Sequence, residues 1–114
     1  MCMYASAEGF ASDFHLVHLG RFALGGAGLV IAEATAITAQ GRISHHDLGI
    51  WDDAHVPGLR KITDFIRTQG SVPGIQLAHA GRRASVREPW REGAPLTSED
   101  ADAGSAPWST VAPS

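Results

Sequence analysis

The first periodic apolar pattern in the chain begins just after residue 12. Apolar side chains recur there at i, i+3 and i+7, the spacing that places them on one face of a helix: Leu16, Leu19 and Ala23. Ser12 and Asp13 precede this stripe, and their side-chain oxygens can accept hydrogen bonds from the unpaired N–H groups of a first helical turn. Gly25 and Gly26 end the pattern. The sequence therefore predicts an amphipathic helix between Ser12 and Gly25.

A near-continuous apolar run follows from Gly28 to Ile37. Its centre consists of four consecutive apolar residues, Leu29, Val30, Ile31 and Ala32. The run lacks the polar alternation of a strand with one wet face, so it predicts a strand buried on both faces, as in a parallel sheet. Residues 38–54 then form a polar excursion.

A second amphipathic pattern covers about His55 to Gln69. Its apolar stripe is made of branched and aromatic side chains: Val56, Leu59, Ile62, Phe65 and Ile66. Gly70 at the first position beyond the helix and Pro73 shortly after it mark the end. The stretch from Val72 to His79 predicts another short buried strand.

The order helix, strand, helix, strand predicts two parallel strands joined through a helix with a right-handed crossover. Such a unit belongs to an α/β fold, and the pattern alone leaves open whether that fold is a barrel or a doubly wound sheet. Both edges of the unit lack a partner. We therefore expect a strand before residue 1, several strands after residue 80, and aggregation of the chain through its open edges. Residues 81–114 are polar and proline-rich, which predicts a long loop with local order.

Composition and charge exclude several classes of function. The chain has 114 residues, too few for a complete (β/α)8 barrel, which needs roughly 250. A net charge of −3 gives no attraction to nucleic acid or to an anionic membrane. No apolar stretch is long enough to cross a bilayer, and the first residues do not resemble a signal peptide. The single cysteine, Cys2, cannot form an internal disulfide, so we expect a cytoplasmic protein.

Six histidines suggest a metal site, but their spacing does not support one. His15 and His18 share a helical face, whereas His45 and His46 are adjacent in the polar excursion, and no CxxC motif accompanies either pair. We expect no metal. Glu33 follows four apolar residues, and we expect this carboxylate to pair with an arginine or lysine of a neighbouring strand rather than to act in catalysis.

Four short motifs go beyond this generic pattern. They are Met1-Cys2-Met3-Tyr4, Glu33-Ala34-Thr35-Ala36 followed by Gly41-Arg42, Asp47-Leu48-Gly49-Ile50-Trp51, and Gly74-Ile75-Gln76-Leu77-Ala78-His79-Ala80-Gly81-Arg82. In this order and spacing they resemble the first part of the old yellow enzymes, in particular the bacterial subclass with a cysteine in the opening motif. The resemblance covers residues 1–83 and leaves 84–114 as a loop-rich remainder.

The resemblance implies a fold and a chemistry. The fold is a partial (β/α)8 TIM barrel, roughly its first third, from the end of strand 1 through strand 3 and the following loop. Residues 1–114 would then be an N-terminal fragment of an FMN-binding domain. NAD(P)H reduces the flavin in this family, and the reduced flavin passes hydride to a small-molecule activated alkene, the activity of an ene-reductase. A homo-oligomer is an open option for the full-length protein.

The resemblance also assigns roles to five residues. Met1 and Cys2 correspond to the segment along the flavin, Ala34 to a backbone contact, Gln76 to the pyrimidine edge and Tyr4 to the substrate pocket. A glutamine amide suits a pyrimidine edge because it offers both a donor and an acceptor. Each side chain also has an ordinary alternative: Cys2 simply packs, Gln76 satisfies a backbone group, and Tyr4 is an amphipathic rim residue.

Other parts of the family pattern come from later strands and have no match here. They are the His-x-x-His or His-x-x-Asn pair, the arginine beside the flavin and the phosphate-binding loops. We therefore assign no catalytic residue, and we expect that the chain alone neither holds FMN tightly nor turns over. Met1 would be an internal methionine of a longer frame. Two main hypotheses remain: a piece of an enzyme, or a non-catalytic truncated flavoprotein or assembly partner. A third, a related flavin enzyme with an added iron–sulfur domain, would require a downstream cysteine cluster that this sequence does not contain.

Overall fold

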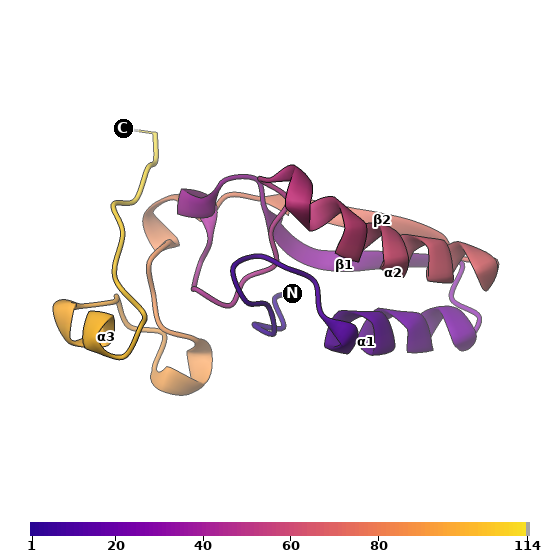
Figure 1. Cartoon of the computed structure of the whole chain (residues 1–114), viewed down its shortest axis with the longest axis horizontal. Coiled ribbons are helices and arrows are strands. Elements are labelled where there is room, and N and C mark those ends of the chain that lie inside the picture. The colour runs from indigo at the N-terminus through magenta and orange to yellow at the C-terminus, as the bar shows by residue number, and fades with distance from the viewer. Residues whose placement is uncertain (114) are drawn as a thin grey trace.

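The computed structural model describes residues 1–113 and confirms the four predicted elements (Figure 1). Helix α1 (Asp13–Leu24) leads to strand β1 (Leu29–Ala36), and helix α2 (Val56–Thr68) leads to strand β2 (Val72–Ala78). Their ends fall within two residues of the predicted positions because local signals set them. Gly26 and Gly70, with φ of +86° and +80°, turn the chain after each helix.

The two strands pair in parallel, from Leu29 beside Val72 to Ala36 beside Ala78. Both helices pack on the same face of this small sheet and share one core with it. That core consists of buried side chains from both helices and β1: Leu19, Ala23, Val30, Ile62 and Ile66. Gly20 lets the helices approach closely, because a Cβ atom at this position would lie 2.8 Å from the ring of Phe65.

The opposite face of the sheet is open within the described residues, so the prediction of strands buried on both faces is wrong for this structure. Leu29, Ile31 and Val72 are 55%, 57% and 60% exposed. The reason is geometric, because α1 and α2 cover one face only. The apolar run in β1 thus makes a covered face through Val30 and an uncovered one through Leu29 and Ile31.

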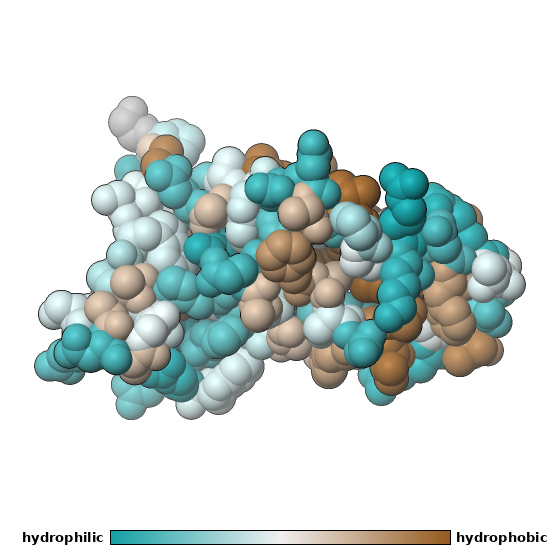
Figure 2. Space-filling model, in the orientation of Figure 1, coloured by the Kyte–Doolittle hydropathy of each residue, from teal (hydrophilic) through white to brown (hydrophobic). Residues whose placement is uncertain are grey.

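Residues 81–113 form the predicted loop with local order. Two 3-10 turns (Gly81–Arg83 and Pro89–Arg91) precede the short helix α3 (Ser98–Asp102), and an extended tail follows. Figure 2 shows this part as mostly pale, tan and teal, whereas most of the dark brown residues lie over the half that holds α1, α2 and the sheet.

The tail is held to the body by a stack of three side chains. The Arg42 guanidinium lies 5.2 Å from the ring centres of both Trp51 and Trp108. Trp108 also donates its indole N–H to the carbonyl of Gln40 at 3.0 Å. Arg42 is only 8% exposed, and its guanidinium also donates to the carbonyl of Ala39 at 2.9 Å and lies 3.9 Å from the Glu8 carboxylate. The two aromatic faces add to the stabilisation of its charge.

Asp100 organises the region around α3. Its carboxylate accepts two hydrogen bonds from the Arg87 guanidinium, at 2.9 and 2.8 Å, and one from the Thr97 N–H at 2.8 Å. Arg87 and Asp100 are 13 residues apart, so their pairing does not follow from charges that are close together in the sequence. The arginine first, and then Thr97, hold the pKa of the Asp100 carboxyl well below its usual range.

This pairing predicts an acid-sensitive C-terminal region. A depressed folded-state pKa contributes stability above the unfolded value of about 4, and that contribution is lost as pH falls through the lower folded value. Amide exchange over residues 84–102 should therefore accelerate between about pH 4 and pH 2 relative to exchange in α2. Asp100→Asn should flatten this dependence. An unchanged ratio in the wild-type chain would contradict the prediction.

Candidate functional site

The N-terminal segment is anchored beside the carboxyl end of β1. The Met3 N–H donates to Oε2 of Glu33, in the second half of the strand. The Ser6 N–H donates to the carbonyl of His46 at 3.1 Å, and the His46 ring lies 3.0 Å from the Ser6 carbonyl. Two anchors three residues apart thus fix the segment that holds Cys2 and Tyr4.

Between these anchors Tyr4 adopts a left-handed backbone conformation, with φ of +53°. A bulky residue in this region costs on the order of 1–3 kcal/mol, and it persists only where the surroundings hold it. The Tyr4 ring packs edge-on against Trp90, with ring centres 5.7 Å apart. The conformation therefore directs Tyr4 toward the C-terminal region.

The loop that receives Ser6 is shaped by Asp47. This buried carboxylate accepts hydrogen bonds from the Ile43 N–H at 2.7 Å, the Ser44 N–H at 3.2 Å and the Ser44 hydroxyl at 3.1 Å. Burial nevertheless raises the pKa of Asp47 above its ordinary value. The Asp47 motif of the sequence thus builds a rigid support for the N-terminal segment.

Ala34 and Gln76 lie side by side in the sheet because β1 contains a bulge. Ala32 pairs with Ile75 and Ala34 with Gln76, so Glu33 is an extra residue with no partner of its own. Side chains alternate along a strand, and one extra residue moves all later ones to the opposite face. The bulge brings Ala34 onto the open face, next to the exposed side chain of Gln76.

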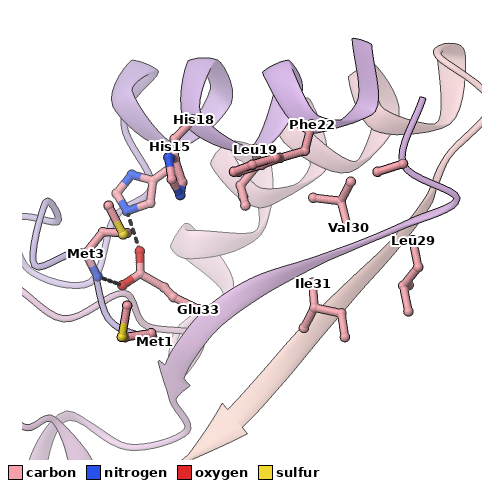
Figure 3. Close-up of a pocket in the computed structure, with 11 residues that line it drawn as sticks. Met1, Met3, His15, His18, Leu19, Phe22, Leu29, Val30, Ile31 and Glu33 are labelled. Carbon is pink, nitrogen blue, oxygen red and sulfur yellow. Dashed lines mark hydrogen bonds and ion pairs between the residues drawn. The ribbon is translucent and has the colours of Figure 1, made fainter. Parts of the chain in front are cut away.

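Among residues 1–113, Glu33 pairs with a histidine and not with an arginine or a lysine, which corrects the expectation from sequence. Its Oε1 lies 3.2 Å from Nε2 of His15, and its Oε2 accepts the Met3 N–H (Figure 3). Both side chains are buried, with Glu33 7% and His15 1% exposed. The bulge explains the difference, because it turns Glu33 toward the first turn of α1 instead of toward a neighbouring strand.

The two polar side chains of the N-terminal segment are held in their neutral forms. Burial, aided by the negative charges of Asp47 and Glu33, raises the pKa of the Cys2 thiol to about 11. Burial and the neighbouring Cys2 raise the pKa of Tyr4 as well. At neutral pH both groups therefore carry a proton and can donate a hydrogen bond.

Of the five predicted site residues, the structure brings Ala34 and Gln76 together as strand partners. Cys2 and Tyr4 lie on the anchored N-terminal segment, where the Tyr4 ring faces the C-terminal region. Met1 is 98% exposed and lines a pocket beside Glu33. Sequence reasoning missed the roles of Glu33 and His15, although the spacing of Ser12 and His15 matches that of a capping box.

These donors and acceptors fit the edges of a flavin ring. Gln76 presents an amide with a donor and an acceptor, Cys2 presents a protonated thiol, and Ala34 presents backbone without a bulky side chain. No group of three histidine, cysteine or carboxylate side chains within residues 1–113 is arranged to hold a metal ion. No helix in the same range has the length and apolar character to cross a membrane.

Comparison with known proteins agrees with this chemistry. Residues 1–109 match the NADH:flavin oxidoreductase / NADH oxidase family. The chain belongs to this family. Its description names a flavin and a nicotinamide nucleotide, so the predicted use of FMN and NAD(P)H is confirmed at the level of the family.

Curated relatives in the family are considerably longer than this chain. An NADPH dehydrogenase of Bacillus licheniformis is 57% identical over 88 residues, which cover 75% of this chain and 26% of the relative. An NADPH dehydrogenase of Bacillus cytotoxicus is 53% identical over 88 residues, which cover 75% of this chain and 25% of that relative. The chain therefore spans about a quarter of the length of the curated relatives it matches.

Solved structures of the family confirm the predicted fold class, part of a TIM barrel. Morphinone reductase in complex with tetrahydroNAD superposes with a TM-score of 0.68 and 27% identity, covering 75% of this chain and 23% of that one. Old Yellow Enzyme from Pichia sp. AKU4542 gives a TM-score of 0.66 and 25% identity, covering 83% and 25%. The resemblance to old yellow enzymes inferred from the sequence motifs is therefore confirmed.

Proposed function

We propose that residues 1–114 are the N-terminal part of an FMN-binding barrel domain in a cytoplasmic ene-reductase. Such an enzyme would oxidise NAD(P)H and reduce a small activated alkene. The observation that carries the proposal is the pairing of Ala34 with Gln76 at the bulge of β1, in a chain that belongs to a flavin oxidoreductase family. The N-terminal segment that holds Cys2 is bonded to Glu33 in the same strand.

Bound FMN would supply reversible hydride transfer between the nicotinamide and the alkene. This chain would hold the ring and shape one side of its surroundings. Gln76 would pair with the pyrimidine edge, the Ala34 backbone would line the ring, and the Cys2 thiol would donate a hydrogen bond to it. Tyr4, protonated at neutral pH, would donate to the polar group of the substrate.

These contacts bind the flavin ring only, and the phosphate of FMN would be bound by other parts of a longer protein. We therefore expect weak binding by the 114-residue chain: FMN in large excess should shift the backbone NMR signals of Cys2, Ala34 and Gln76, while gel filtration gives a colourless protein peak. Riboflavin, which lacks the phosphate, should produce the same shifts at the same concentration. A yellow peak with FMN but not with riboflavin would contradict the proposed division of roles.

Gln76→Leu provides the sharpest variant for this experiment. It removes a donor and an acceptor worth about 0.5–1.5 kcal/mol each, so we expect roughly tenfold weaker FMN binding in the titration. Gln69→Leu is the matched control, because Gln69 is also exposed but follows α2 at the other end of the sheet. Equal weakening by both variants, or by neither, would argue against the role assigned to Gln76.

The open apolar face of the sheet supports a second candidate, a non-catalytic chain that acts through assembly. Leu29, Ile31 and Val72 would then be covered by strands of another polypeptide. Flavin binding that appears only after such a partner is added would favour assembly between chains over a piece of a single longer enzyme.

A further inference from the structure

The Glu33 carboxylate uses each of its oxygens for a different segment of the chain. Oε1 lies 3.2 Å from the His15 ring in α1, and Oε2 accepts the Met3 N–H of the N-terminal segment. Figure 3 shows Glu33 between these two partners, with a dashed line to each. A carboxylate buried to this extent is costly unless its oxygens are hydrogen-bonded, so these two donors account for its position.

The proton on His15 is assigned by the network around the ring. Nδ1 lies 3.0 Å from the backbone nitrogen of Ser12, and because that N–H can only donate, Nδ1 is an acceptor. In a neutral ring the proton then sits on Nε2 and points at Glu33. The Ser12 N–H thus donates to His15, and the Glu33 carboxylate accepts hydrogen bonds from both the His15 ring and the Met3 N–H.

Met3 is the point at which these hydrogen bonds act on the candidate site. It lies between Cys2 and Tyr4, and the next anchor, at Ser6, leaves Tyr4 in its left-handed conformation. Without the bond to Glu33 the segment keeps the anchor at Ser6 and the ring contact of Tyr4 with Trp90, but it loses its backbone anchor next to Cys2. The strained backbone of Tyr4 would then be free to relax, and Cys2 would move with it.

We propose that the buried Glu33–His15 pair is a positioning device that fixes Met3 and thereby places Cys2 and Tyr4 at the carboxyl end of β1. This inference deepens the proposed function and rests on it for the ligand that Cys2 and Tyr4 face. The placement itself is independent of the flavin and is tested without it.

The wild-type chain gives the first test through hydrogen exchange of single amides. The Met3 amide should exchange at least about tenfold more slowly than an unprotected amide, although it lies three residues from the N-terminus. Unprotected exchange at Met3, in a sample whose α2 amides are protected, would overturn the proposal. This result does not depend on any variant remaining folded.

Cys2 gives the second test, because a thiol reagent added to a chain with one cysteine reports on that residue alone. In Glu33→Gln an NH2 group replaces one carboxylate oxygen, so either His15 or Met3 loses its hydrogen-bond acceptor. The segment should then loosen, and labelling of the Cys2 thiol should accelerate by roughly three- to tenfold. Glu99→Gln is the matched control, since Glu99 is exposed on α3, and its labelling rate should equal that of the wild type.

His15→Phe separates positioning from charge. Loss of the Glu33 charge alone would make the Cys2 thiolate easier to form, whereas His15→Phe retains that charge. Faster Cys2 labelling in both single variants, with no further gain in the double variant, would show that Glu33 and His15 act together in holding the segment. Acceleration in Glu33→Gln alone would be an effect of charge and would overturn positioning.

An NMR titration with excess FMN then distinguishes failure of this inference from failure of the proposed function. If the Glu33–His15 pair positions the N-terminal segment, Glu33→Gln should lose the FMN-induced shifts at Cys2 and Tyr4 and keep those at Ala34 and Gln76. Retention of all four shifts in Glu33→Gln would overturn the positioning role. If FMN shifts no signal in the wild type, the proposed function fails, and amide exchange and thiol labelling still decide the placement.

Discussion

Ile66→Ala should lower the free energy of unfolding by about 3–4 kcal/mol. Ile66 is 2% exposed and belongs to the core shared by both helices and β1, so the substitution removes buried apolar area and leaves a cavity. A chain of this size has a small core, so this loss is a large fraction of its total stability. Urea denaturation followed by circular dichroism measures the change.

Ile31→Ala is the control with the same chemical change. Ile31 is 57% exposed on the open face of the sheet, and its truncation should cost less than about 1 kcal/mol. Comparable losses for the two variants would contradict the open face and would show that another surface covers Ile31 in solution.

The second large effect concerns the stack that holds the C-terminal tail. Trp108→Ala removes one aromatic face from Arg42 and the hydrogen bond to Gln40, which together stabilise the docked tail by about 2 kcal/mol. We expect residues 103–113 to become protease-sensitive and their amides to exchange faster, while the exchange of α2 is unchanged.

Trp90→Ala is the matched control for this prediction. Trp90 is 67% exposed and lies against Tyr4 rather than against Arg42. It should leave the proteolysis of residues 103–113 at the wild-type rate. Release of the tail by Trp90→Ala but not by Trp108→Ala would show that the stack does not hold it.

The elements that sequence predicted well are those set by neighbouring residues. Gly26 and Gly70 end the helices through backbone conformations that glycine adopts without strain, and the helical stripes of α1 and α2 follow a fixed period. Burial of the strands was predicted incorrectly, because an apolar run does not specify which segments cover it.

The candidate site was predictable in its residue types but not in its connections. Resemblance selected Cys2, Ala34 and Gln76, and their role in flavin binding stays a prediction. Glu33 was assigned to a cationic partner because buried carboxylates usually have one. Its pairing with His15 depends on a bulge that arises only when β1 meets β2, and the Arg42 stack depends on contact across more than 60 residues.

The bulge at Glu33 makes β1 sensitive to pairing as well as to composition. Before the bulge, Val30 and Ala32 point toward the helices. After the bulge, the alternation of side chains between the two faces is shifted by one residue. If Glu33 paired as an ordinary strand residue instead of bulging, every later residue of β1 would shift by one position, as codons shift after a frameshift in a gene. Thr35, fully buried, and Ala34 would then exchange faces, although every amino acid of the strand was retained.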